Sequence, residues 1–297
     1  YHNSLGADVV LLGKSICSDS LEKECSNPER KELFEREGFQ TYYGTPLIAK
    51  GEIKGVLELL FKQKHSETNT LWQYYADAIA TQAAIAVDNA NLFEKLERSN
   101  IELSLAYDTT LEGWAKALEL RDQETEGHSR RVTGLTTKLC RIMHVPDTVS
   151  VHMRRGAILH DIGKMGIPDQ ILQKAGPLND EEWEIMRMHP MYAYQWLSTI
   201  NYLQPALDIP HYHHERWDGG GYPDGLKQDQ IPIAARIFAI VDVWDALRSD
   251  RPYRNAWSHE KAITYLKEQS GSHFDPLVVE SFLKIVDPQT QASEPDG

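Results

Sequence analysis

One stretch decides how this chain is interpreted: Leu159-His160-Asp161-Ile162-Gly163-Lys164. Its adjacent histidine and aspartate offer a nitrogen and a carboxylate ligand, donor types that suit iron, manganese or zinc. Taken alone, the pair also fits an ordinary helix end, with Asp161 solvated and Gly163 terminating the helix. Further residues of the ligand type on both sides favour a metal site.

Candidate ligands lie both upstream and downstream of this stretch. Glu124 and His128 are four residues apart, so on a helix they would share one face and could chelate one metal. Asp242 lies in the apolar run 238–244, where a carboxylate is costly unless it is paired or bound to a metal. The candidates are too many for one tetrahedral zinc and predict a cluster of two or three metals. They are Glu124, His128, His160, Asp161, His189, His213, His214 and Asp242.

Length and composition bound the class of protein. The 297 residues suffice for one large or two medium domains. With 44 acidic against 31 basic residues, the formal charge of −13 argues against binding to a nucleic-acid polymer or an anionic membrane. No apolar run reaches the about 18 residues that a transmembrane helix needs, and no signal peptide is visible.

The cysteines and the first residue bear on location and completeness. Cys17, Cys25 and Cys140 are widely spaced and odd in number, which fits neither a disulfide framework nor a zinc knuckle. We therefore expect a reducing, cytoplasmic location. The chain begins with Tyr1 rather than methionine, so a fragment of a longer protein is expected.

Residues 1–68 predict a small α/β domain. Alternating and apolar runs bounded by glycine or turn residues are typical of strands, and a charged run closed by glycine is typical of a surface helix. The expected elements are a strand at 8–12, a helix at 28–37 closed by Gly38, and a hairpin of strands 42–49 and 53–61 with its turn at 50–52.

The segment 45–59 and the apolar positions at 76–86 resemble the end of a GAF domain. The resemblance covers roughly residues 1–90 and implies that the N-terminal part of such a domain is missing. It leaves two roles open: a structural dimerisation unit, or a sensor of an unknown ligand.

The segment from Thr70 to about Leu120 contains no proline and predicts one long helix. Asn89 would lie in a heptad seam along it, where a polar residue fixes register at some cost in stability. We favour a parallel two-helix stalk at 69–106, and hence a homodimer, over one amphipathic helix packed on its own domain. The seam consists of Ala78, Gln82, Ile85, Asn89, Leu92, Leu96, Ser99 and Leu103.

Residues 107–290 are expected to be almost entirely helical, which makes the chain an α+β protein with an all-α second domain. Two loops rich in glycine and proline, 164–178 and 214–232, interrupt the helical pattern. Helical spacing occurs at 129–144, 149–162, 179–198, 232–249 and 258–268.

The stretch His160-Asp161-Ile-Gly-Lys164, followed by His213-His214-Glu-Arg-Trp-Asp-Gly-Gly-Gly221-Tyr222-Pro223, resembles the HD-GYP branch of the HD phosphohydrolases. The resemblance extends over about residues 107–288. It implies a helical fold, a centre of two or three transition metals, most often iron or manganese, and hydrolysis of the bacterial second messenger cyclic di-GMP in signal transduction. It also implies ligand roles for the whole candidate set, with Glu124 as the extra carboxylate of the three-metal members.

The resemblance has two departures. Ala193 stands where glycine is expected, which concerns packing rather than chemistry. His211 is an additional histidine beside the ligand pair, and either a spectator role or a contact behind the ligands fits it.

The resemblance also implies roles in catalysis and substrate binding. Asp161 would bridge metals, and Lys164, one helical turn after His160, would contact a non-bridging phosphate oxygen. Arg251 and Arg254, three residues apart, would hold the second phosphate or a guanine edge. The predicted substrate-binding residues are Lys164, Gly221, Tyr222, Pro223, Arg251 and Arg254, and the predicted catalytic residues are Asp161 and Lys164.

The expected reaction is hydrolysis of cyclic di-GMP to the linear dinucleotide pGpG, with GMP as an alternative end product, by a hydroxide bridging two metals. Two other functions stay open. One is a non-enzymatic cyclic-dinucleotide receptor, against which the intact ligand set argues. The other is an HD hydrolase for a different substrate such as cyclic GMP-AMP.

Overall fold

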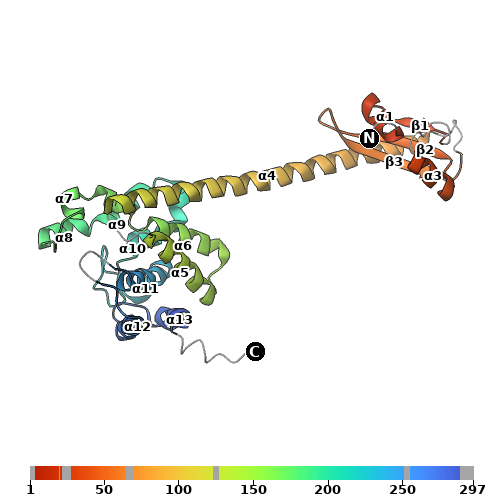
Figure 1. The fold of residues 1–297 in the computed structure, drawn as a ribbon. Coiled ribbons are helices and arrows are strands. Elements are labelled where there is room, and N and C mark those ends of the chain that lie inside the picture. The colour runs from red at the N-terminus through yellow and green to blue at the C-terminus, as the bar shows by residue number, and fades with distance from the viewer. Residues whose placement is uncertain are drawn as a thin grey trace. The chain divides into compact units, whose positions relative to one another are not determined.

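The structure is a computed structural model that describes residues 4–19, 21, 28–64, 70–122, 127–250 and 255–287. It is mostly helical with one small sheet, as Figure 1 shows. The chain divides into two compact units, residues 1–104 and 105–297, and each is described by itself. No helix of the described part of the chain is both long enough and apolar enough to cross a membrane.

The N-terminal unit contains an antiparallel sheet of strand order β1-β2-β3. Lys50 and Gly51 join β2 to β3 with φ of 51° and 79°, the left-handed values that suit a two-residue hairpin turn. The predicted hairpin is therefore confirmed. The helix predicted at 28–37 is confirmed as well, since α3 has these bounds. The elements are β1 (Ile16–Ser18), α3 (Pro28–Glu37), β2 (Thr41–Ala49) and β3 (Glu52–Phe61).

The strand predicted at 8–12 is wrong, because this segment belongs to helix α1 (Leu5–Leu12). The Ser4 side chain accepts a hydrogen bond from the Ala7 N–H and caps the N-terminus. Gly13, at φ 63°, closes the other end, with its N–H bonded to the Val9 carbonyl. Capping residues just outside the apolar run thus favour a helix over a strand. Within α1, the buried residues are Leu5 and Val9, which lie one helical turn apart.

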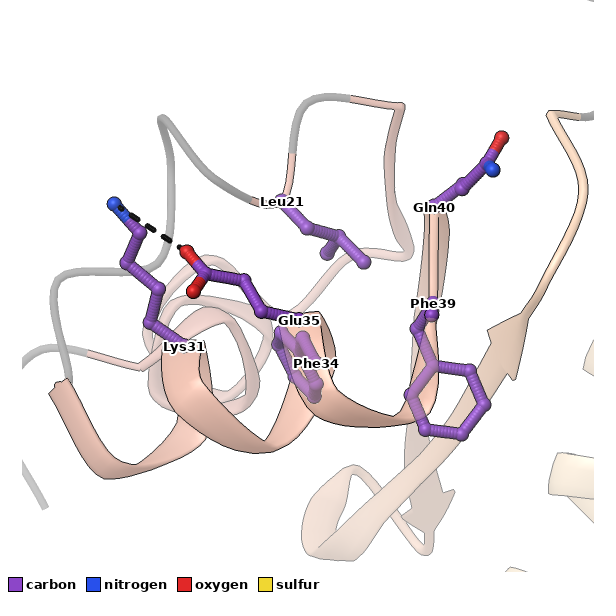
Figure 2. A pocket seen from close by; sticks show the side chains of 7 residues that line it. Leu21, Lys31, Phe34, Glu35, Phe39 and Gln40 are labelled. Atoms are coloured by element: carbon purple, nitrogen blue, oxygen red, sulfur yellow. Dashed lines mark ion pairs between the residues drawn. The ribbon is translucent and has the colours of Figure 1, made fainter.

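A small pocket of about 200 Å³ lies beside the C-terminal end of α3 (Figure 2). It is smaller than the roughly 300–1,000 Å³ of typical small-molecule sites. No side chain pattern around it identifies a ligand, and the GAF-like character of this unit stays a prediction. The lining residues are Leu21, Lys31, Phe34, Glu35, Gly38, Phe39 and Gln40.

The long helix predicted from Thr70 is confirmed as α4 (Leu71–Asp122). In the N-terminal unit, Ala76, Ala80 and Ala84 are buried at intervals of four residues. The Tyr43 hydroxyl donates to Asp77 at 2.7 Å, and Lys54 pairs with Asp88 at 3.0 Å. One face of α4 therefore packs within its own chain, and other faces do not.

The C-terminal unit is built around α11 (Ile233–Arg248), which is buried on most sides. Phe238 and Val241 are fully buried in a core that also receives side chains from α5, α12 and α13. The other elements are α5 (His128–Ile142), α6 (Asp147–Leu159), η1 (Ile162–Gly166), α7 (Asp169–Leu172), α8 (Asp180–Met186), α9 (His189–Leu197), η2 (Asn201–Ala206), α10 (Asp208–Tyr212), η3 (Gln228–Gln230), α12 (His259–Glu268) and α13 (Pro276–Val286).

The helix predicted at 179–198 is divided into α8 and α9. Asn179 and Glu182 form a capping box that begins α8. Pro190 lies in the first turn of α9, where its missing N–H is tolerated. The break places His189 at the start of a helix, facing inward.

Candidate metal centre

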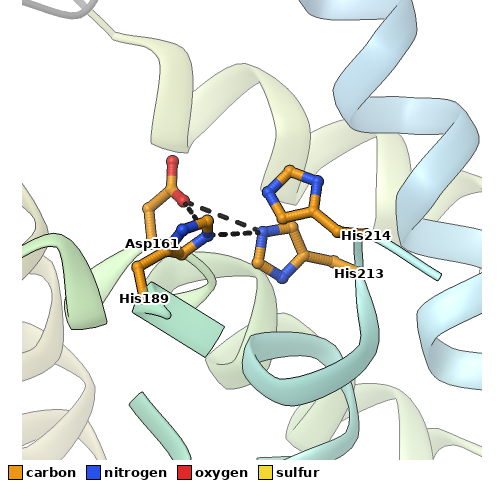
Figure 3. Close-up of side chains that lie close together, drawn as sticks. All are labelled: Asp161, His189, His213 and His214. Atoms are coloured by element: carbon orange, nitrogen blue, oxygen red, sulfur yellow. Dashed lines mark hydrogen bonds and ion pairs between the residues drawn. The ribbon is translucent and has the colours of Figure 1, made fainter. Parts of the chain in front are cut away.

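Seven ligand side chains converge in two groups within the C-terminal unit. In each group, one ligand atom per residue lies within 4.8 Å of all the others. The first group is Asp161, His189, His213 and His214, shown in Figure 3, and the second is His128, His160 and Asp242.

The first group is assembled from three segments. Asp161 directly precedes η1, His189 begins α9, and His213 follows α10. The His189 Nε2 lies 3.3 Å from Asp161 Oδ1 and 3.5 Å from His213 Nε2, and the His213 Nε2 lies 3.7 Å from the same carboxylate oxygen. Three atoms that can each bind a metal therefore converge on one point.

The second group joins α5, the end of α6, and α11. The His128 Nε2 lies 3.5 Å from His160 Nε2 and 3.6 Å from Asp242 Oδ1. On its other side, His160 Nδ1 is 2.9 Å from the Ala157 carbonyl, which only accepts, so the ring donates there. The Nε2 of His160 thus faces the centre.

Asp161 lies between the two groups. Its Oδ1 faces His189 and His213, while its Oδ2 is 3.0 Å from His160 Nε2. A carboxylate with one oxygen toward each group is the arrangement that bridges two metals. The bridging role of Asp161 stays a prediction, and this arrangement of its two oxygens supports it.

The protonation states of His189, His214 and Asp161 in the first group fit metal binding. Burial lowers the pKa of His189 to about 3 and that of His214 well below the usual value. Burial alone would raise the pKa of Asp161, but the charges of His160 and Lys164 hold it well below its usual range. Neutral imidazoles and an ionised carboxylate are the forms that ligate metals.

The hydrogen-bond pattern gives the strongest argument for a cation. His189 donates from Nδ1 to the Met186 carbonyl at 2.8 Å, and His213 donates from Nδ1 to the Ile209 carbonyl at 3.0 Å. A neutral ring with its hydrogen on Nδ1 has only a lone pair at Nε2. Two such lone pairs and a carboxylate oxygen of Asp161 therefore face one another in a buried site, which is unfavourable without a cation among them. Histidines that bind a metal usually donate their other ring N–H to a carbonyl or carboxylate in this way.

Lys164 lies directly beside this centre. Its Nζ is 2.7 Å from Asp161 Oδ2 and 2.6 Å from Asp122 Oδ2. Its side chain is only 15% exposed. A cation is thus held at the edge of the ligand groups, where a substrate phosphate would need one.

Gly163 explains how η1 can approach α9. A Cβ on Gly163 would lie 1.8 Å from the His189 carbonyl oxygen and 2.7 Å from the Ala193 N. Any larger residue would push the two segments apart, and with them the ligands Asp161 and His189. Ala193, where glycine was expected, is fully buried, and its backbone N lies against Gly163.

The predicted substrate loop is attached to the ligand pair. A Cβ on Gly221 would lie 2.4 Å from the Arg216 N, so glycine is needed for the loop to pass so closely. Pro223 follows a cis peptide bond. The Tyr222 ring stacks on His214 at 4.7 Å, and burial raises the pKa of its phenol, which keeps it a hydrogen-bond donor.

Glu215 holds the far side of this loop. Its buried carboxylate accepts hydrogen bonds from the N–H groups of Asp224, Gly225 and Leu226 at 2.7 to 3.0 Å. The residue directly after the ligand pair therefore shapes the loop that covers the pair.

Three predicted residues lie outside the described residues: Glu124, Arg251 and Arg254. His211 belongs to neither ligand group. Its Nε2 lies 3.3 Å from Met191 Sδ, and its ring stacks between Tyr194 and Tyr212. Its contacts are those of a packed core histidine.

The structure adds Asp245, Asp122 and Arg187, for which sequence reasoning gave no role. Asp245 is one helical turn after Asp242, a spacing that could have indicated it. Asp122 contacts Lys164 from the end of α4, which no local pattern indicates. The Arg187 guanidinium lies 5.7 Å from the Tyr222 ring centre, within cation–π range, and its position two residues before His189 was the available signal.

Asp245 orients the ligand His128. Its Oδ2 lies 2.8 Å from His128 Nδ1, and Arg131 donates to both oxygens at 2.6 and 2.9 Å. Burial would raise the pKa of Asp245, but the bonds from His128 and Arg131 lower it to about 2. Because the pKa in the folded protein lies below the ordinary aspartate value of 3.8, this carboxylate stabilises the fold above about pH 4, and its contribution is lost as the pH falls toward 2.

Asp245→Asn should weaken metal binding by the second group about 10- to 100-fold, because loss of a carboxylate behind a ligand histidine has effects of this size. Competition with a chelator would measure the loss. Asp229→Asn is the control, since Asp229 also pairs with an arginine but is exposed and belongs to neither group. Equal metal affinity in the two variants would contradict an orienting role for Asp245.

Comparison with known proteins identifies the family to which the segment that holds both groups belongs. A family model described as HD domain matches residues 114–278, which contain every ligand of both groups. The chain is 34% identical over 270 residues to a Vibrio cholerae protein named 3'3'-cGAMP-specific phosphodiesterase 2, an alignment that covers 90% of this chain and 50% of that protein. It is 44% identical over 169 residues to a cyclic di-GMP phosphodiesterase of Thermotoga maritima, covering 56% of this chain and 46% of the relative.

A cyclic di-GMP phosphodiesterase of Vibrio cholerae is 37% identical over 216 residues, covering 68% of this chain and 44% of the relative. The chain thus spans about half the length of the curated relatives it matches. The matched family segment is more than half of the chain, and it carries the histidine and aspartate ligands of both groups. The chain belongs to the HD domain family.

Proposed function

We propose that this chain is a metal-dependent phosphodiesterase that hydrolyses cyclic di-GMP. The observation that carries the proposal is the convergence of the His189 and His213 lone pairs with the Asp161 carboxylate, beside a second group reached by the other Asp161 oxygen. Relatives with 37% to 44% identity bear this activity in their names. Such a pair of sites suits attack on a phosphodiester.

In this proposal the two groups hold two transition metals, iron or manganese, which accept imidazole and carboxylate ligands together. Glu124 is proposed as a ligand of a third. The chemistry that bound metals supply at such a site is a hydroxide at neutral pH and neutralisation of charge on phosphorus. The chain's own contribution is to keep His189 and His214 neutral, to orient His189 and His213 through backbone carbonyls, and to keep Asp161 ionised.

The positions of Lys164 and Tyr222 support two substrate contacts, and two arginines outside the described residues are proposed from the sequence. Lys164 lies beside Asp161 and would meet a non-bridging phosphate oxygen. Tyr222, with Gly221 and Pro223, covers His214 and would contact a base or a phosphate. Arg251 and Arg254 are proposed to hold the second phosphate. Hydrolysis adds water across one P–O bond to give pGpG, and a second hydrolysis would give GMP.

Cyclic GMP-AMP is a second candidate substrate. The relative aligned over 90% of this chain is named for its action on 3'3'-cGAMP. Both cyclic dinucleotides present the same two phosphodiesters, so the ligand groups do not distinguish them.

The test is metal analysis and product identification on one preparation. Protein purified without oxygen should contain more than one transition metal per chain and should convert cyclic di-GMP to a linear product. Parallel reactions with 3'3'-cGAMP would rank the two substrates. Tight binding of cyclic di-GMP by the metal-loaded protein without any linear product would favour a receptor instead, and a single tetrahedral zinc would overturn the proposed centre.

We also propose that the chain forms a homodimer through α4. Four apolar residues of the predicted seam, Ile85, Leu92, Leu96 and Leu103, are 45% to 59% exposed within their own chain. Exposed apolar residues at heptad spacing are typical of a helix that packs on a partner helix.

Sedimentation should therefore show a dimer at micromolar concentration, and Leu92→Glu should shift it toward monomer because a charge would enter the seam. Val87→Glu is the matched control, since Val87 is also exposed on α4 but lies outside the seam. A monomeric parent, or equal effects of the two variants, would refute the seam.

A further inference from the structure

We infer that Arg121, in the last turn of α4, is a positioning residue for Lys164. The inference rests on the proposed function, in which Lys164 meets the substrate phosphate. Arg121 itself lies behind the lysine, and its guanidinium contacts the backbone that carries Lys164.

The guanidinium of Arg121 contacts the C-terminal part of η1 and the residues that follow it. It donates to the carbonyls of Lys164 at 3.1 Å, Met165 at 3.0 Å and Ile167 at 2.8 Å. It also donates twice to Asp169 Oδ1, at 3.0 and 2.7 Å. The Lys164 carbonyl also accepts from the Ile167 N–H at 3.0 Å. The last carbonyls of a helix commonly need partners from outside it, and Arg121 supplies donors here and ties η1 to the segment that follows.

The neighbouring residue fixes the lysine side chain. Asp122 Oδ2 lies 2.6 Å from Lys164 Nζ, on which Asp161 Oδ2 also converges. The backbone of Lys164 is thus held by Arg121 and its amine by Asp122, both from the same turn of α4. In return, Gln173 Nε2 donates to the Arg121 carbonyl at 3.2 Å.

The location of η1 makes this contact matter for the site. Asp161 directly precedes η1 and Lys164 lies within it, so a shift of this short helix moves the lysine relative to the bridging carboxylate. Reacting groups tolerate little displacement, and a misplacement of about 1 Å can cost about 100-fold in rate. Holding η1 rigid is therefore a condition for Lys164 to act.

Only arginine has the geometry for these contacts. Its planar group presents five donors in a fixed fork, whereas a lysine amine is a single point charge on a flexible stem. Arg121→Lys keeps the charge near η1 but cannot reach several carbonyls and the carboxylate together. This variant therefore separates positioning from simple electrostatics.

The test is a double-mutant cycle on the full, metal-loaded chain. Arg121→Lys should lower kcat about 10- to 100-fold, with metal content unchanged and KM changed much less. In the Lys164→Ala background the same substitution should have no further effect on kcat, because it acts through the lysine. Equal losses in both backgrounds, or metal loss in the single variant, would overturn the inference.

Arg154→Lys is the matched control for this cycle. Arg154 also bridges to α4, but its ion pairs are with Asp108 and Glu112 rather than with residues beside η1. It should leave kcat at the parent value. A loss of kcat as large as that of Arg121→Lys would mean that any weakened contact with α4 suffices, and would remove the specific role of Arg121.

A second readout does not depend on turnover. Lys164 is held between two carboxylates and should react slowly with an amine-acylating reagent, as followed by mass spectrometry. Arg121→Lys should accelerate acylation of Lys164 at least several-fold but leave Lys174, which pairs with Glu182, unchanged. Unchanged acylation of Lys164 would refute positioning even in an active enzyme, and a protein without turnover that shows the acceleration would refute only the proposed function.

Discussion

Asp161→Ala should remove at least one metal from each chain and abolish measurable turnover, a loss beyond about 1000-fold. The reason is that the Asp161 carboxylate reaches both ligand groups, with Oδ1 toward His189 and Oδ2 toward His160. Loss of one preorganised electrostatic group commonly costs about 100- to 1000-fold, and this variant would lose a metal ligand in addition.

Elemental analysis of the purified variant would measure the metal loss, with product formation from cyclic di-GMP measured alongside. The control is Asp229→Ala, which removes an exposed aspartate that pairs only with Arg236. A variant that retains the parent's full metal content would show that Asp161 does not bridge, whatever its rate.

Lys164→Ala should have the opposite pattern: full metal content with kcat reduced about 100- to 1000-fold. The lysine is not a ligand, but its amine lies 2.7 Å from Asp161 at the edge of the centre. Its charge would act mainly where negative charge grows on the phosphate, so kcat should fall more than KM rises.

Lys174→Ala is the matched control, because Lys174 also forms an ion pair, with Glu182, but lies outside both ligand groups. Loss of metal from Lys164→Ala would mean that the lysine serves the ligands rather than the substrate. A purely raised KM would assign it to substrate binding alone.

Several elements could be predicted because their signals are local. The absence of proline from Thr70 onward defined α4, and the turn at Lys50-Gly51 defined the hairpin. The segment at 8–12 was misassigned because its apolar run fits a strand or a buried helix equally, and the deciding caps, Ser4 and Gly13, lie outside the run.

In the candidate site, too, the local features could be predicted from the sequence and the contacts between distant segments could not. The motif gave the ligand types, since His160 and Asp161 are adjacent, but not their grouping. His128 and Asp242 are separated by most of the C-terminal unit, and only folding shows that they belong together with His160. Asp122 acts through a contact between elements, for which the sequence carries no periodic signal. Asp245 lies one helical turn after Asp242, but its partner His128 is 117 residues away, and only folding brings the two together.

The ligands of the two groups come from α5, the end of α6, the start of α9, the end of α10, and α11. Bound metal would therefore act as a cross-link among segments distant in sequence, and its binding free energy would add to the free energy of unfolding. Each tenfold rise in free metal above the dissociation constant would contribute about 1.4 kcal/mol per site. The folded fraction of this unit would then follow the metal supply of its surroundings.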